Sequence, residues 1–395
     1  MLRRGTLLLL MLFAVTFLSG CTRSTADIAG APPAEAATEP PPPTAAPTLE
    51  PSPTLSPTPS ATPTAAPTPT PLPPVRVVAS YPIDGDKAFV PDRPLTIAFD
   101  RPMNPEAVAQ ALTLSPAVEG VVEWPEPQRM VIRPAEPWAE GEHALTLAAG
   151  PLGNAGEPLE APLELRFSVG GRGVPVPILM YHAIEDLDEG ASSTKRTWTV
   201  SPAAFAEQMA YLLAEGWTTI SPGQLAAYLT AGEPLPPKPL VISMDDGYKE
   251  VHSVVYPLLK DTLLRPVLYI PPDHVGLRAY LDWDQLRELV DAGFWIGTHG
   301  YDHTPLREAS DADLPRQLGE SKVFFEDALG ITIDSFCYPY GSYDQRTLDG
   351  LVAHGYTSAM TLNPLVYQVP GEPLLLSRLL VDYDMTLEEF TELLP

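Results

Sequence analysis

The feature of this sequence that most restricts its fold is an alternation of short apolar runs with helical segments, which begins near Val174 and continues to the last residue. The apolar runs predict strands at residues 176–181, 240–243, 266–270, 294–297, 335–338 and 358–361. Helices are expected to begin at Ser201-Pro202 and Ser221-Pro222 and to cover residues 283–292, 312–329 and 345–354. This order predicts an α/β fold over residues 171–395, a distorted (β/α) barrel. In such folds the chemistry lies where strands end and loops begin.

A separate all-β segment precedes this region. Between residues 75 and 170, strands are predicted at 75–80, 95–99, 112–114, 120–124, 129–133, 143–147 and 163–169. About seven short strands over this length indicate a small β-sandwich. The stretches Tyr81-Pro82-Ile83-Asp84-Gly85 and 97–103 resemble the bacterial Ig-like domains of surface proteins. We find no catalytic or metal-binding pattern in this segment.

The first 20 residues are expected to be a targeting signal. Arg3 and Arg4 precede an apolar run over residues 7–17, which is too short for a membrane span. The run ends in Leu18-Ser19-Gly20-Cys21, which resembles the lipobox of bacterial lipoproteins; an ordinary signal peptide that ends near a cysteine is the alternative. The resemblance implies an exported lipoprotein, anchored in the membrane and facing the extracytoplasmic side. Residues 21–74 are rich in Pro, Thr and Ala and predict a disordered linker.

The charge of the chain limits its expected partners, and its cysteine content limits its expected disulfides. The 395 residues include 50 acidic and 24 basic side chains, which gives a formal net charge of −26. This charge excludes a basic nucleic-acid footprint and fits a protein that acts on neutral or cationic glycans. If Cys21 carries lipid, Cys337 has no partner within the chain, and we expect no internal disulfide.

Two carboxylates and two histidines stand at the ends of predicted strands. Asp245 and Asp246 directly follow one strand, and His299 and His303 follow another with a spacing that lets both imidazoles face one point. Taken alone, an acidic pair is also typical of a helix N-terminus, and the histidines are compatible with a polar loop. Together they favour a metal site with three protein ligands, one carboxylate and two imidazoles. The second carboxylate then remains free to act as a base.

Three motifs follow one another along the chain: Ser243-Met244-Asp245-Asp246-Gly247, the histidine motif at residues 299–303, and Phe336-Cys337-Tyr338-Pro339-Tyr340-Gly341. They resemble the motifs of the polysaccharide deacetylases with a NodB homology domain, carbohydrate esterase family 4, with Met244 in place of the usual Phe. Two further stretches, at residues 177–182 and 281–286, resemble the branch that includes poly-N-acetylglucosamine deacetylases. The motifs occur in the family's order, and the resemblance covers about residues 175–395.

The resemblance implies roles for the matching residues. Asp245 would be the general base, and Asp246, His299 and His303 would hold a divalent metal, with Zn²⁺ as first choice and Co²⁺ or Ni²⁺ as alternatives. Such a metal lowers the pKa of water and polarises an acetamide carbonyl. A backbone N–H near Tyr340 would help to stabilise the oxyanion. The implied reaction is N-deacetylation, with acetate and a free amine as products.

The chain departs from the family pattern at three places. Gly300 replaces the usual hydroxyl residue of the second motif, Cys337 stands where many members carry an arginine, and the C-terminal stretch lacks a late histidine to protonate the amine. In the branch with an early Met-Tyr-His motif, the first strand supplies this histidine, and His182 has the matching position; packing is the alternative role. Arg378 is a candidate to hold Asp245 in place; an ordinary ion pair at the surface or the edge of the core is the alternative role for this arginine.

Aromatic residues of the third motif suit a sugar-binding groove, because aromatic faces fit the apolar faces of sugar rings. The predicted substrate-binding residues are Tyr338, Pro339, Tyr340 and Arg378. Packing at the end of the strand is the alternative for Tyr338. His252 and His274 are expected to be helix and loop residues rather than ligands.

The predicted function is metal-dependent removal of N-acetyl groups from a cell-surface or extracellular polysaccharide, with poly-N-acetylglucosamine or peptidoglycan glucosamine as substrate. An O-acetyl esterase of the xylan type with the same site is one alternative. The other is a non-catalytic, glycan-binding surface lipoprotein, which the three departures motivate. The expected partners are the acetylated glycan and, through the lipid anchor, the membrane; we expect no nucleic acid and a monomer.

Overall fold

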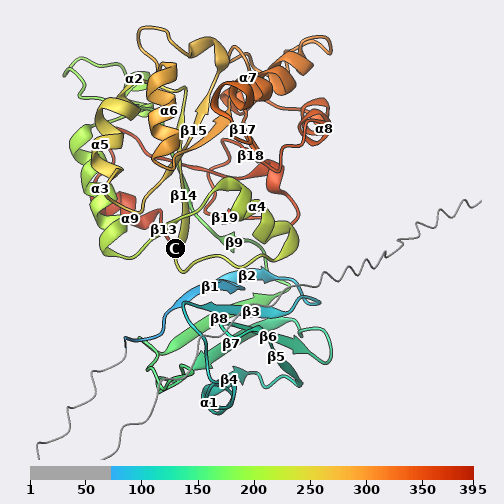
Figure 1. Ribbon diagram of the computed structural model, residues 1–395. Helices are drawn as coiled ribbons and strands as arrows, with labels where there is room; N and C mark the ends of the chain where they lie inside the picture. Colours follow the sequence, from blue (N-terminus) through green and yellow to red (C-terminus); the bar gives the residue numbers. More distant parts are fainter. Residues whose placement is uncertain (1–72) are drawn as a thin grey trace, which may run out of the picture. The chain divides into compact units, whose positions relative to one another are not determined.

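The computed structural model describes residues 73–395, which belong to the compact unit Pro69–Pro395. The predicted signal peptide, Cys21 and nearly all of the linker at 21–74 lie outside the described residues. Within 73–395, no helix combines the length and the apolar character that crossing a membrane requires. The described residues form an all-β part followed by an α/β part (Figure 1).

Two four-stranded sheets form the all-β part, with the orders β1-β3-β6-β5 and β2-β8-β7-β4. The strands are β1 (Val77–Tyr81), β2 (Asp86–Phe89), β3 (Leu95–Phe99), β4 (Leu112–Ser115), β5 (Gly120–Glu126), β6 (Arg129–Pro134), β7 (Gly141–Leu147) and β8 (Leu163–Val169). Leu95, Ile97 and Phe167 are among the buried residues of their core. All seven predicted strands are present. The Ig-like assignment stays a prediction.

Two elements of the all-β part were not predicted. Strand β2 has the sequence Asp-Lys-Ala-Phe, and its two charged residues hide the apolar pattern of a strand. Helix α1 (Pro105–Ala111) is a short helix, capped by the Asn104 side chain, which accepts from the backbone N–H groups of Glu106 and Ala107.

A parallel sheet carries the α/β part, with the order β18-β17-β16-β15-β14-β10-β20 and with β13 beside β14. Its strands are β10 (Ile178–Tyr181), β13 (Thr218–Thr219), β14 (Pro239–Asp245), β15 (Pro266–Ile270), β16 (Trp295–Thr298), β17 (Ser335–Cys337), β18 (Ser358–Met360) and β20 (Leu379–Leu380). All six predicted strands appear within two residues of their predicted ends. Strands β14 and β15 are buried along their whole length, as strands covered on both faces are.

The sheet is a half-barrel, whereas the sequence predicts a distorted barrel. In the described part of the chain, its end strands β18 and β20 do not pair with each other. This side is linked instead through Leu376, which forms a bridge with Met360, accepts from the backbone N–H of Thr361 and donates to the backbone oxygen of Ala359. Strand β20 has only two residues, and its ladder is with β10. The sheet therefore stays open at this edge.

Helices lie around the parallel strands (Figure 1). Two begin at the predicted caps: α3 (Pro202–Ala214) follows Ser201, and α4 (Pro222–Ala231) follows Ser221. Helices α6 (Trp283–Asp291) and α8 (Gln345–Ala353) also match their predictions. The helix predicted at 312–329 differs, because a π-helical turn, η3 (Arg316–Glu320), precedes the α-helix α7 (Ser321–Leu329).

The remaining elements are short. They are α2 (Ser193–Thr197), α5 (Tyr256–Leu259), α9 (Leu387–Glu392), the π-helical turn η1 (Val251–Val255), the 3₁₀ turns η2 (Pro272–His274), η4 (Pro339–Gly341) and η5 (Pro373–Leu375), and the strands β9 (Val174–Pro175), β11 (Ala183–Ile184), β12 (Thr199–Val200) and β19 (Tyr367–Gln368). Because β10, β14, β16 and β17 are parallel, their carboxyl ends meet at one edge of the sheet. The predicted site residues lie at or after these ends, except for Arg378, which directly precedes β20.

Candidate metal centre and active-site pocket

The acidic pair lies at the carboxyl end of β14. Asp245 is the last residue of this strand and is 2% exposed. Asp246 has a φ of 70° and Gly247 a φ of 76°, so the chain turns sharply out of the sheet. A Cβ at Gly247 would come within 2.8 Å of Ile270 Cγ2, and therefore the turn requires glycine there. As a result, the two neighbouring carboxylates reach different partners.

Asp246 meets both histidines of the second motif. His299 directly follows β16, and His303 lies in the loop beyond it with a φ of 64°. Asp246 Oδ1 is 3.3 Å from His303 Nε2 and 3.7 Å from His299 Nε2, and the two Nε2 atoms are 3.2 Å apart. Within the described residues, the buried Asp246 Oδ1 has no hydrogen-bond donor. Three atoms that can bind a metal thus converge on one point.

The protonation state of His299 suits a metal ligand. Its Nδ1 lies 2.8 Å from the backbone oxygen of Cys337, so Nδ1 carries the proton and donates while Nε2 keeps its lone pair. Burial lowers the pKa of His299 to about 4, so the imidazole is neutral at pH 7. Burial alone would raise the pKa of Asp246, but the contacts with His303 and His299 hold it below its ordinary value. This donor set fits a divalent metal such as Zn²⁺.

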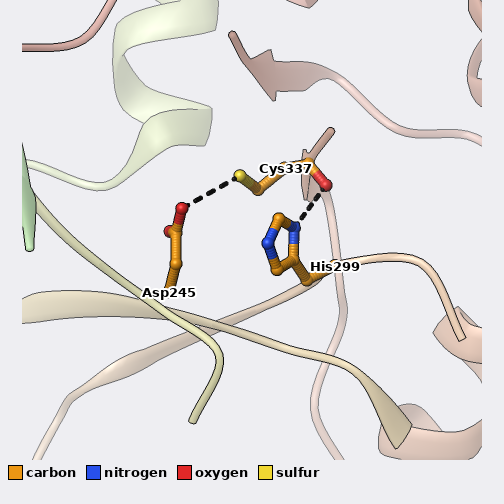
Figure 2. Close-up of side chains that lie close together, drawn as sticks. All are labelled: Asp245, His299 and Cys337. Carbon is orange, nitrogen blue, oxygen red and sulfur yellow. Dashed lines mark hydrogen bonds between the residues drawn. The ribbon is translucent and has the colours of Figure 1, made fainter. Parts of the chain in front are cut away.

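A second group of possible ligands shares His299 with the first and consists of Asp245, His299 and Cys337 (Figure 2). Its chemistry suits a metal less well. Cys337 Sγ lies 3.5 Å from Asp245 Oδ2, and burial raises the pKa of the thiol well above its ordinary value, so it remains protonated. On this side His299 already donates from Nδ1 to the Cys337 backbone (Figure 2). Of the two groups, Asp246, His299 and His303 is therefore the one whose chemistry better fits a metal.

Asp245 is held by Arg378. Both oxygens of Asp245 lie 2.8 Å from Arg378 Nη1, and the guanidinium, which is 0% exposed, also donates from Nε to the backbone oxygen of Thr361. Burial alone would raise the pKa of Asp245, but the guanidinium and the nearby imidazoles lower it. The carboxylate is therefore ionised and fixed in orientation. Arg378 lies directly before β20, far in sequence from the third motif, where many family members carry an arginine; in space, Arg378 and Cys337 of that motif both contact Asp245.

His182 lies on the other side of Asp245. It follows the end of β10, and its Nε2 is 3.8 Å from Asp245 Oδ2. The ring packs 4.5 Å from that of Trp198, and within the described residues its buried Nδ1 has no hydrogen-bond partner. Burial lowers the pKa of His182, although the two aspartates oppose this effect. The histidine of the early motif thus lies next to Asp245 rather than in the group of possible metal ligands.

These groups line one pocket of about 590 Å³. Its wall also includes residues that the sequence analysis did not select, namely Trp198, Tyr248, Tyr280 and Leu362, together with His274. His274 lies in η2 and donates from Nδ1 to the backbone oxygen of Asp246 at 3.1 Å, so it lies beside the ligand group without joining it. Tyr248 could have been found from its place next to the acidic motif. Trp198 and Leu362 carry no such sequence signal.

The predicted substrate-binding residues have different surroundings. Tyr340 is 65% exposed, has a φ of 56°, and lies with its ring 4.6 Å from that of His303, on the pocket wall. Tyr338 is 1% exposed and lines the pocket while its hydroxyl donates to the backbone oxygen of Leu374. Pro339 is buried and lies outside the pocket lining. Of these three residues, Tyr340 offers the largest free surface to a ligand.

Two histidines outside the pocket, His252 and His354, have structural contacts. His252 lies in η1, and its Nε2 is 2.8 Å from Glu288 Oε2. His354 is the C-cap residue of α8 and packs against Gly319, where an added Cβ would meet its ring. Neither residue lines the pocket.

The chain is similar to a known family and to several known proteins. Residues 232–359 match the sequence profile of the family described as polysaccharide deacetylase. The chain is 26% identical over 189 residues to YxkH of Bacillus subtilis, a protein named as a candidate polysaccharide deacetylase, and 32% identical over 227 residues to the poly-β-1,6-N-acetyl-D-glucosamine N-deacetylase of Escherichia coli K12. These alignments cover 48% and 47% of this chain. They cover 65% and 33% of the relatives, so the chain spans less than two thirds of the length of either.

A solved structure extends the likeness to the fold. The Streptococcus pyogenes deacetylase PplD in complex with acetate is 25% identical to this chain, with a TM-score of 0.53. The match covers 56% of this chain and 99% of that protein. Together with the family match, this supports a polysaccharide deacetylase domain of the NodB homology type in the α/β part.

Proposed function

We propose that the protein removes N-acetyl groups from a polysaccharide by metal-dependent hydrolysis. The observation that supports this proposal most is the Asp245–Arg378 pair beside the convergent carboxylate and imidazoles of the metal site, in a single pocket. The arrangement separates the group that takes a proton from the groups that hold the metal. The family match of residues 232–359 points to the same reaction.

Each side chain has a separate task in this reaction. When held by Asp246, His299 and His303, a divalent metal supplies Lewis-acid polarisation of the acetamide carbonyl and lowers the pKa of water. Asp245 is ionised and accepts the proton of the attacking water. Because Arg378 occupies both of its oxygens, Asp245 keeps one orientation during proton transfer.

His182 is proposed to donate the proton that the leaving nitrogen needs. Its Nε2 is 3.8 Å from Asp245 Oδ2, close enough for the proton that Asp245 accepts to pass to the imidazole after a small movement. Burial lowers the pKa of His182, which makes its protonated form a stronger donor. The C–N bond then breaks, the nitrogen takes the proton, and acetate and the free amine are released.

The pocket wall is suited to a sugar chain. The exposed ring of Tyr340 and the ring of Trp198 lie on the pocket wall, where aromatic faces can contact the apolar faces of pyranose rings. We propose poly-N-acetylglucosamine or peptidoglycan glucosamine as the substrate, a choice that the name of the Escherichia coli relative supports for the first. The net charge of −26 favours a substrate without negative charge.

The proposed place of action is the extracytoplasmic side of a membrane, with lipid on Cys21. The stretch Leu18-Ser19-Gly20-Cys21 and the Pro-, Thr- and Ala-rich linker that follows it support this proposal. Metabolic labelling with a radioactive fatty acid tests it: the wild-type protein is expected to take up label and C21S is expected to remain unlabelled. Equal labelling of both proteins would contradict it.

Acetate release tests the activity. The full-length chain is stripped of metal, reloaded with Zn²⁺ or Co²⁺, and incubated with N-acetylglucosamine oligomers and with acetylated xylan. We expect release from the oligomers, and no release by D245N although that variant still binds metal. Release from xylan alone would favour the O-acetyl esterase, which needs the same site. No release from either substrate by a metal-loaded protein would favour the non-catalytic glycan-binding protein.

A further inference from the structure

The loop that carries His303 has a strained backbone. Gly300 and His303, at its two ends, have φ values of 69° and 64°. For a residue with a side chain, this left-handed region costs about 1–2 kcal/mol. Such a conformation persists only where the surroundings hold it. The position of His303 Nε2 opposite Asp246 therefore depends on contacts made to the loop.

Gln317 makes two of these contacts. Its Oε1 accepts from the backbone N–H of Tyr301 at 2.8 Å, and its Nε2 donates to Asp302 Oδ1 at 2.9 Å. Gln317 is 3% exposed, so these bonds form away from water. Both ends of its amide are thus bound to consecutive residues between the two histidine ligands.

Arg316 holds the same two loop residues from the next position. Its Nη1 donates to Asp302 Oδ2 at 2.5 Å, and its guanidinium lies 3.9 Å from the centre of the Tyr301 ring. The Asp302 carboxylate thus accepts from Arg316 through Oδ2 and from Gln317 through Oδ1.

The backbone conformations of the turn η3 and of the loop that carries His303 both fit these contacts. Arg316 and Gln317 open the π-helical turn η3, a rare geometry that is frequent at functional sites. On the loop side, a Cβ at Gly300 would lie 3.1 Å from Gln317 Oε1 and 3.3 Å from Pro339 Cγ. The Gln317 amide thus takes up the space beside Gly300, and a side chain at this position would press against it.

We propose that Gln317, together with Asp302 and Arg316, is a positioning residue that pre-forms the metal site by holding His303 against Asp246. None of the three belongs to the group of ligand atoms, so their effect passes through the loop. The inference rests on the metal site of the proposed function but not on the reaction itself. In this view Gly300 is part of an intact site rather than a sign of a decayed one.

Metal affinity, measured without substrate, tests this proposal. The full-length Q317L variant is prepared metal-free, and its Kd for Zn²⁺ is measured by competition with a chromophoric chelator. We expect the affinity to fall by about 10- to 100-fold, the usual effect of losing a group that orients a metal ligand. The absorption of bound Co²⁺ is expected to change as well, because His303 no longer has one position. Circular dichroism of the metal-free protein checks the fold.

Q208L is the matched control. Gln208 is also buried, at 2% exposure, and its side chain accepts one hydrogen bond from the Tyr181 hydroxyl, away from the loop. Its Zn²⁺ affinity is expected to equal that of the wild type. If Q317L fails to fold, Q317E keeps the size and the acceptor but loses the donor to Asp302, and it too is expected to bind Zn²⁺ more weakly.

Two outcomes would overturn the inference: wild-type affinity in the folded Gln317 variants, or an equal loss in Q317L and Q208L. Acetate release by the wild-type protein is measured in parallel. Release by a wild type whose Gln317 variants bind Zn²⁺ normally would overturn the positioning role and leave the proposed function intact. An inactive wild type, together with weakened Zn²⁺ binding in Q317L, would support the positioning role and overturn the proposed function.

Discussion

The Asp245–Arg378 pair gives a prediction whose size follows from burial. The guanidinium is 0% exposed and the carboxylate 2%, and Nη1 lies 2.8 Å from both carboxylate oxygens. A buried charge that loses its partner remains uncompensated, which costs about 3–5 kcal/mol. We therefore expect R378L to lower the free energy of unfolding by about this amount in metal-free protein. D245N is expected to destabilise for the same reason, because it leaves Arg378 buried without a counter-charge.

The double variant D245N/R378L separates a pairwise effect from two independent ones. It buries neither charge, so its cost is expected to be smaller than the sum of the single costs by at least about 2 kcal/mol. Urea unfolding of the four proteins, in the presence of a chelator, supplies the four free energies. A coupling energy within about 0.5 kcal/mol of zero would refute the claim that Arg378 acts on Asp245.

Arg265 offers a matched control for this cycle. Its Nη1 donates to the backbone oxygens of Leu259, Thr262 and Leu264 and has no carboxylate partner among the described residues. R265L is also expected to destabilise the protein, because it leaves carbonyl groups without donors. Its effect is expected to add to that of D245N, since the two residues share no contact.

Three further predictions concern catalysis, substrate binding and pH. H182A is expected to lower kcat by about 10²- to 10⁴-fold with an unchanged Kd for Zn²⁺; unchanged kcat would place the acid elsewhere. Y340A is expected to raise KM for the oligomers more than it lowers kcat, and steady-state kinetics would contradict this if only kcat fell. Burial raises the pKa of Asp86 from 3.8 to about 6, despite its bond from Tyr228. The folded state therefore holds this proton longer, and stability falls by about 2 kcal/mol between pH 4 and pH 6. The stability of D86N relative to wild type should rise by this amount, and a pH-independent difference in urea unfolding would refute the assignment.

The sequence predicted the strands of the fold because their patterns are local. Strand β15 is a run of five buried residues and has its predicted bounds, and Ser201 and Ser221 cap the helices that they were expected to begin. The opening of the barrel could not be predicted, since it depends on the two-residue strand β20, which has no pattern of its own. The π-helical turn η3 could not be predicted either, because its composition is that of an ordinary helix.

The site shows the same limit. Asp246, His299 and His303 could be selected because they follow predicted strands, and the structure brings their ligand atoms together. Arg378 was a candidate to hold Asp245, 133 residues away, and the structure forms this contact. Gln317 comes from a position without a motif, 16 residues from Tyr301. Its contacts depend on how elements pack, and the sequence alone did not reveal them.

Backbone strain bears on the choice between an enzyme and a non-catalytic binding protein. Of the four non-glycine residues with positive φ in residues 73–395, three are Asp246, His303 and Tyr340. A positive φ at each of these residues costs about 1–2 kcal/mol, which glycine would avoid. Gly247 and Gly341, which directly follow Asp246 and Tyr340, adopt a positive φ without this cost. A turn that only connects elements would therefore be more stable with glycine. The side chains kept at these positions are two members of the ligand group and the exposed ring at the pocket. A protein that only bound glycans would gain nothing from the strain at Asp246 and His303, so this distribution favours the metal-dependent enzyme.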